Sequence, residues 1–156
     1  MADHRPDRMV GDERTTLLAL LQFQRESIVR KVSGITDEQA RTSPVPSGTT
    51  LQWLIRHVKF AEEVWVVRNY GDRAIIHIDD TETQTVEQAI ASYRLTWEIV
   101  DELVWDAASL DVPCRDGLGG PDTTLRWAVM HLLEEVARHA GHADILRELI
   151  DGQTGR

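Results

Sequence analysis

The sequence predicts an all-α protein built as a four-helix bundle, and three observations lead to this prediction. Four long segments repeat apolar residues at the 3.6-residue period of an amphipathic helix. No segment shows the alternation of a β-strand over a comparable length. The chain has 156 residues, which is the size of one ordinary domain. We therefore expect one bundle domain over residues 12–152, preceded by a flexible polar tail at residues 1–11.

The first predicted helix covers residues 12–32 and stops before Gly34, because glycine readily adopts the left-handed conformation that ends a helix. Thr36 and Gln39 then have the spacing of a capping box, which predicts a short helical turn. Pro44 prevents this turn from continuing as a helix. The core-facing positions of the first helix are Leu17, Leu21, Ile28 and Val32.

The second predicted helix covers residues 49–70. We expect it to start at Thr49, with Gln52 completing a capping box, and to end at Gly71. It carries two apolar stripes instead of one, so it is predicted to be buried over much of its surface. One stripe is Leu51, Leu54, Ile55, Val58, Ala61 and Trp65, and the other is Trp53, Phe60, Val64 and Val67.

The third predicted helix opens near Thr85 and carries apolar residues on one face as far as Val104. The fourth begins after Thr123 and continues to about Ile150, where Gly152 closes it. The connectors between the helices are longer than is usual in bundles, and long loops over a rigid scaffold often shape a site. These connectors are residues 34–48, 71–84 and 109–121.

The charge and cysteine content exclude several classes of function. Against 17 Lys and Arg stand 26 Asp and Glu, for a net charge of −9, which is the wrong sign for binding nucleic acid or an anionic membrane. A single cysteine allows no internal disulfide. No apolar run reaches the roughly 20 residues of a membrane span, and the N-terminus has no signal-peptide pattern. We therefore expect a cytoplasmic protein that binds a small molecule.

Two predicted helices each carry metal-ligating side chains in the middle of an apolar row. Glu135 and His139 lie four residues apart on the fourth helix, and His142 lies three residues further on the same face. His57 interrupts the second stripe of the second helix. Such groups are costly to bury unless something pairs with them, and bundles build metal sites from facing helices. The pattern predicts a divalent metal on His57, Glu135 and His139.

A different interpretation of these residues stays open. His57 alone is typical of a core histidine bonded to a carbonyl, and Glu135 with His139 is typical of a surface pair. If the three residues do bind a metal, they leave coordination positions open, which is the arrangement of catalytic zinc. Two imidazoles with one carboxylate also suit iron.

Several separated segments, in the same order, resemble the DinB superfamily. Residues 134–148, which read EEVARHAGHADILRE, resemble the last-helix signature of that superfamily. PSGTTL at 46–51, followed by LIRHV at 54–58, resembles its second helix. Shorter matches lie at 34–40 and 124–127, and the spacing agrees from about residue 12 to 153.

This resemblance implies a four-helix bundle with a divalent metal between the second and fourth helices. Many members use three histidines, whereas this chain has Glu135 at the first position of the i,i+4 pair. The related mycothiol-dependent maleylpyruvate isomerases use His, Glu and His, which keeps the predicted trio intact. The resemblance further implies zinc, or else nickel or iron, a low-molecular-weight thiol such as mycothiol or bacillithiol, and a homodimer.

The function predicted from these observations is thiol transfer or isomerisation on a small electrophile, because a metal-bound thiol becomes a thiolate. The alternative is a non-catalytic bundle stapled by a metal, or a dimeric interaction module. A fourth ligand from His142 would favour the alternative. The family pattern instead places a polar residue that is not a ligand there, so we favour a supporting contact for His142. Glu62 is predicted either to accept a bond from a ligand or act as a general base, or equally to form a salt bridge inside the bundle.

Overall fold

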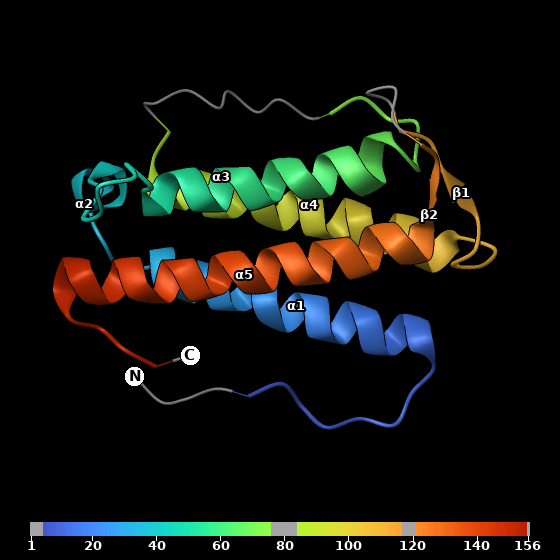
Figure 1. Ribbon diagram of the computed structural model, residues 1–156, viewed down its shortest axis with the longest axis horizontal. Coiled ribbons are helices and arrows are strands. Elements are labelled where there is room, and N and C mark those ends of the chain that lie inside the picture. The colour runs from blue at the N-terminus through green and yellow to red at the C-terminus, as the bar shows by residue number, and fades with distance from the viewer. Residues whose placement is uncertain (1–4, 76–83, 117–120, 156) are drawn as a thin grey trace.

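The computed structural model describes residues 5–75, 84–116 and 121–155, and this part of the chain forms a helical bundle (Figure 1). The prediction of an all-α four-helix bundle is confirmed. A two-residue antiparallel pair, β1 (Pro113–Cys114) with β2 (Thr123–Thr124), lies before the last helix. The helices are α1 (Glu13–Val32), α2 (Asp37–Arg41), α3 (Leu51–Glu62), which continues as the π-helical segment η1 (Glu63–Arg68), α4 (Val86–Asp106) and α5 (Leu125–Asp151).

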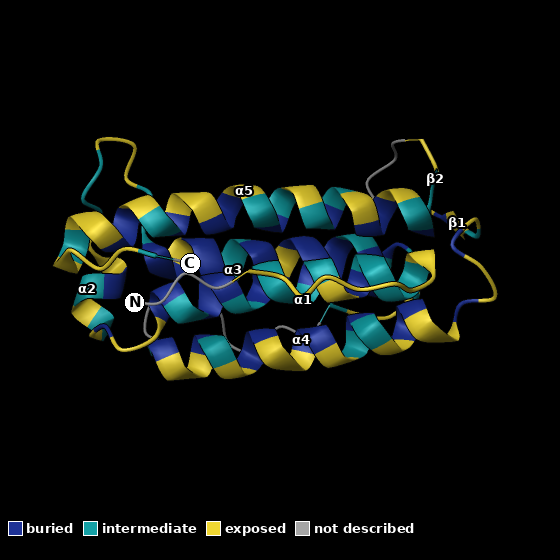
Figure 2. Cartoon of the chain, turned by 90° about the horizontal axis from the view of Figure 1, so that it is seen from below, coloured by how far each residue is buried: buried dark blue, intermediate teal, exposed yellow. Residues whose placement is uncertain are grey.

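The four long helices lie side by side (Figure 1), and each carries buried residues along its length (Figure 2). Helix α5 packs against α1 and α3, and α3 packs against α4. Every long helix contributes fully buried side chains to the core, among them Leu21, Leu54, Val100 and Leu132. The α3–α5 contact is the one that matters for the site, because both predicted sets of ligands lie along it.

The helix ends follow the capping signals, with one correction. The capping boxes Thr36–Gln39 and Thr85–Gln88 are both formed, and Gly152 closes α5 in the left-handed conformation. The predicted start at Thr49 is wrong by one residue. Thr50 is the cap, because its side chain accepts the N–H of Trp53.

The second apolar stripe of α3 is less buried than the sequence predicts. Trp53 and Phe60 are about half exposed, whereas Val64 and Val67 further along are buried. The exposed part of this row lies at the outer edge of the α3–α5 contact, where no further helix covers it among the described residues. His57 lies between Trp53 and Phe60 in this row, and its side chain is 31% exposed, so it lies at the surface and not in the core. Among the described residues, no helix is both long and apolar enough to cross a membrane.

Candidate metal centre

The side chains of His57, Glu135 and His139 meet between α3 and α5. One ligand atom from each residue lies within 4.8 Å of the others. Oε1 of Glu135 is 2.9 Å from Nε2 of His57 and 3.1 Å from Nε2 of His139. Each of the two imidazoles, which come from different helices, thus points its Nε2 atom at the same carboxylate oxygen. This convergence of three donors is the arrangement that a shared cation requires.

The cluster is partly open to solvent. The exposed fractions of the side chains are 31% for His57, 21% for Glu135 and 10% for His139. His139 is therefore the most buried of the three side chains, and His57 is the most exposed.

The indole ring of Trp53 covers one face of the His57 imidazole. Its ring stacks on His57, with centroids 4.6 Å apart and planes 10° apart, and its centroid lies 6.0 Å from that of His139 with the planes at 74°. A stacked ring restricts the orientation of the imidazole. This stacking was not predicted from the sequence, although Trp53 lies four residues before His57, a spacing that places both on one helix face.

The protonation of the cluster suits a cation. Burial raises the pKa of the Glu135 carboxyl, but the hydrogen bond to His57 and the charge of His139 lower it more, so it lies below its ordinary value. Burial lowers the pKa of His139, and the attraction of Glu135 only partly opposes this effect. An ionised carboxylate beside a neutral imidazole is the form of these groups that binds metals.

His142 contacts the cluster from behind. Its Nδ1 lies 3.3 Å from Nδ1 of His139, which is the ring nitrogen facing away from Glu135. A partner on the second nitrogen fixes the tautomer and orientation of a metal-binding histidine. His142 lies outside the three-residue group, and a supporting role for its contact with His139 stays a prediction.

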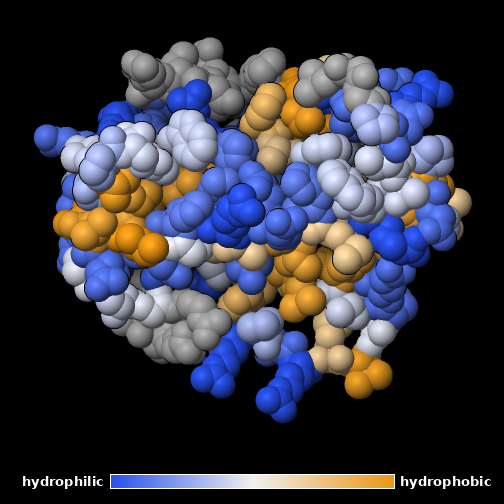
Figure 3. All heavy atoms as spheres, in the orientation of Figure 1, coloured by the Kyte–Doolittle hydropathy of each residue, from blue (hydrophilic) through white to orange (hydrophobic). Residues whose placement is uncertain are grey.

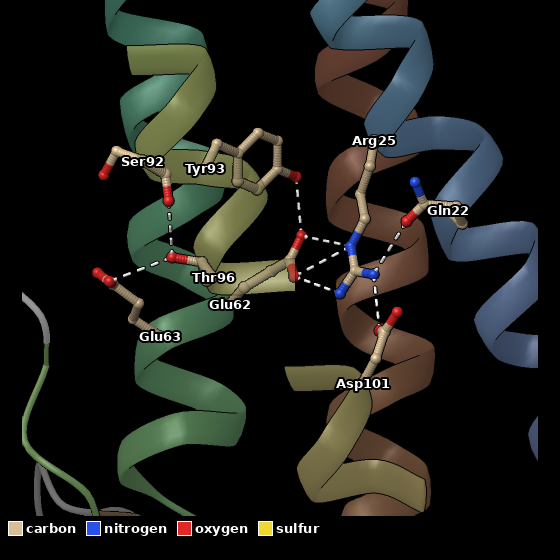
Figure 4. Close-up of polar contacts among 8 residues, drawn as sticks. All are labelled: Gln22, Arg25, Glu62, Glu63, Ser92, Tyr93, Thr96 and Asp101. Atoms are coloured by element: carbon tan, nitrogen blue, oxygen red, sulfur yellow. Dashed lines mark hydrogen bonds and ion pairs between the residues drawn. The ribbon is translucent and has the colours of Figure 1, made fainter. Parts of the chain in front are cut away.

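Glu62 lies in a polar network between α1, α3 and α4 (Figure 4). Its fully buried carboxylate receives hydrogen bonds from Arg25, the shortest of them 2.6 Å, and from the hydroxyl of Tyr93 at 2.8 Å. Asp101 binds the other side of the guanidinium at 2.8 Å. Of the two roles that the sequence left open, the structure therefore has the salt bridge inside the bundle. These bonds direct the Glu62 carboxylate toward α1 and α4, and an acid–base role for it stays a prediction.

The donor set fits a divalent metal on its chemistry. Two imidazole nitrogens and one carboxylate oxygen are ligands that zinc, nickel and iron accept. In the protein alone, protons on the two Nε2 atoms satisfy the shared oxygen, and a cation would take the place of these protons. Three protein ligands leave positions for an exogenous molecule, and the exposed side of the cluster is where that molecule would bind.

Comparisons with known proteins agree with the fold and extend the resemblance. A conserved protein from Enterococcus faecalis, known from a crystal structure, superposes with a TM-score of 0.72. The match covers 92% of this chain and 100% of that chain at 14% identity, so it supports the fold alone. A search of curated proteins found no match. The model of the mycothiol S-transferase family matches residues 16–152, which is nearly the whole bundle. The predicted resemblance to the DinB superfamily is thereby confirmed, and the chain belongs to the mycothiol S-transferase family, a DinB-like family.

Proposed function

We propose that the protein is a divalent-metal-dependent transferase that joins a mycothiol-type thiol to a small electrophile. The observation that carries the proposal is the convergence of the partly exposed side chains of His57, Glu135 and His139. Membership of the mycothiol S-transferase family supports the thiol as one of the two substrates. In such a transfer the thiol loses its proton, a sulfur–carbon bond forms, and the leaving group departs with its electron pair.

Each residue of the centre has a separate task in this proposal. His57, Glu135 and His139 hold the cation, for which zinc is our first choice and nickel or iron the alternatives. A cation bound there lowers the pKa of a coordinated thiol and so supplies a thiolate at neutral pH. Trp53 and His142 hold the two imidazoles in position. Isomerisation through reversible addition of the thiol would use the same residues.

We further propose that the protein acts in the cytoplasm, where free thiols are kept reduced, and as a homodimer. Size measurement of the purified protein by light scattering tests the dimer directly. A monomeric mass at micromolar concentration contradicts it.

Metal analysis of purified variants tests the ligand set. We expect about one equivalent of zinc per chain in the wild type and a loss of most of it in the His57→Ala variant. His131→Ala is the matched control, because His131 also lies on α5 but stacks on Trp127 outside the cluster. If His57→Ala keeps its zinc, or if His131→Ala loses it equally, the proposed ligand set is wrong.

Titration of the cobalt-substituted protein with thiols tests the open coordination position. A thiolate bound to cobalt produces a charge-transfer absorption band, and we expect this band with a mycothiol-type thiol and its loss in Glu135→Ala. The absence of a band with every thiol tested would favour a metal that only staples α3 to α5.

A further inference from the structure

A pocket of about 410 Å³ lies beside the cluster, between the loop that precedes α3 and the C-terminal half of α5. This volume is in the range of sites that hold small organic ligands. Hydrophobic side chains gather over this end of α5 on the surface (Figure 3). The pocket is lined by Val45, Ser47, Thr49, His142, Ile145 and Leu146.

His142 connects this pocket to the proposed metal ligands. It lines the pocket, and its Nδ1 lies 3.3 Å from Nδ1 of His139. The centroids of the two rings are 5.3 Å apart. A molecule in the pocket is therefore separated from the cluster by the width of one imidazole. His142 is thus shared by the wall of the pocket and the surroundings of the proposed metal ligands.

The loop wall of the pocket is built in advance. Gly48 has φ +78°, which a residue with a side chain rarely adopts, and its N–H donates to the carbonyl of Val45 at 3.1 Å. The hydroxyls of Ser47 and Thr49 lie 3.0 Å apart, and Thr50 caps α3. A wall with this many internal bonds needs little ordering when a ligand binds, which favours affinity.

The lining chemistry indicates what the pocket binds. Val45, Ile145 and Leu146 provide apolar walls, while the two hydroxyls and the imidazole offer hydrogen bonds to a neutral polar group. No carboxylate, lysine or arginine is among the lining residues that the structure describes. We propose that this pocket binds the apolar tail of the electrophile and selects uncharged substrates that carry a short aliphatic chain. The inference deepens the proposed function, on which its catalytic meaning rests.

Titration of the metal-free protein with two ketones and one carboxylate tests the pocket without requiring activity. The probes are 2-pentanone, 2-heptanone and hexanoate, and the readout is the NMR signals of labelled isoleucine and leucine methyl groups. We expect shifts at Ile145 and Leu146. The affinity for 2-heptanone should exceed that for 2-pentanone by up to about fifteenfold, because two more methylene groups are buried. Hexanoate should bind at least about tenfold more weakly than 2-heptanone, since a buried carboxylate lacks a partner.

Two matched variants separate the pocket from the surrounding hydrophobic surface. Ile145 and Leu149 lie one turn apart on α5 and are 58% and 56% exposed, but only Ile145 lines the pocket. Ile145→Asn should weaken binding of 2-heptanone at least about fivefold, since an amide replaces about half of its apolar contact. Leu149→Asn should change it by less than about twofold. Equal losses in the two variants, or no shift at Leu146 in the wild type, would overturn the inference.

A kinetic comparison connects the pocket to the proposed reaction. In the zinc-loaded protein with a mycothiol-type thiol, 1-chloro-2-heptanone should have a higher kcat/KM than 1-chloro-2-pentanone, and Ile145→Asn should remove this advantage. A wild type that turns over neither compound contradicts the proposed function, and the ketone titration then decides the pocket by itself. Turnover of both compounds with no preference for the longer chain contradicts the pocket alone.

Discussion

Replacing Glu62 by glutamine tests whether this carboxylate stabilises the bundle or takes part in chemistry. The substitution keeps the shape of the side chain and removes its charge. Arg25 and Glu62 are both fully buried, and Nη2 of Arg25 lies 2.6 Å from Oε2 of Glu62. Tyr93 donates to the other carboxylate oxygen at 2.8 Å. The neutral amide therefore leaves a buried guanidinium without its main counter-charge.

The size of the effect follows from these contacts. Removal of one partner from a buried ion pair costs about 3–5 kcal/mol. Asp101 is partly exposed and still binds Arg25 at 2.8 Å, so we expect the lower end, about 3 kcal/mol. For a chain of this length, such a loss lowers Tm by roughly 6–12 °C. Urea unfolding of the metal-free protein, followed by circular dichroism, measures the free energy of unfolding directly.

Two further variants test whether the loss of stability comes from the unpaired buried charge of Arg25. Asp101→Asn removes the outer, partly exposed partner and should cost no more than about 1 kcal/mol. The double variant Arg25→Met, Glu62→Leu removes both buried charges, and its stability should lie closer to the wild type than that of Glu62→Gln. The zinc affinity of Glu62→Gln should stay within about twofold of the wild type. A Glu62→Gln variant that is as stable as the wild type but has lost activity would refute the structural role.

Three other predictions concern separate regions of the chain. Burial raises the pKa of the Cys114 thiol from 9.0 to about 11. Alkylation of this thiol by iodoacetamide at pH 8 should therefore be about a hundredfold slower in the native than in the urea-unfolded protein, and the native rate should rise up to about pH 11. Equal rates at pH 8 contradict this prediction. A Cβ added at Gly141 meets nothing within 4 Å. Gly141→Ala should therefore raise the free energy of unfolding in urea by about 0.5–1 kcal/mol, because alanine is the better helix former. A loss of stability would mean that another part of the protein covers this face of α5. Trp53→Ala removes the ring that stacks on His57. The affinity for zinc, measured in competition with a chelator, should fall by about threefold to tenfold. An unchanged affinity would show that the stacking does not orient the imidazole.

The helices could be predicted from the sequence because their signals are local. An apolar period of 3.6 residues and a cap such as Thr85 with Gln88 act within one or two turns of chain. The error at the start of α3 has the same origin. Thr49 and Thr50 are adjacent hydroxyl residues that both suit a cap, and the Ser47–Thr49 contact in the loop leaves Thr50 as the one that binds the helix.

The candidate site could be predicted in part. The i,i+4 spacing places Glu135 and His139 on one face of any helix, and the position of His57 in an apolar row marks it as unusual. Only the structure brings the three side chains together, because His57 and Glu135 are 78 residues apart along the chain. Whether they bind a metal stays a prediction.

The sequence by itself determined the all-α class, the helix boundaries to within a few residues and the identity of the side chains that meet at the centre. Only the tertiary structure decided that the side chains of the centre are partly exposed, that Glu62 pairs with Arg25, and that the loop before α3 forms a pocket beside His142. The physical reason is distance along the chain. Helix formation and capping depend on neighbours within a few residues, whereas exposure and the choice of a charged partner depend on which helix packs on which face.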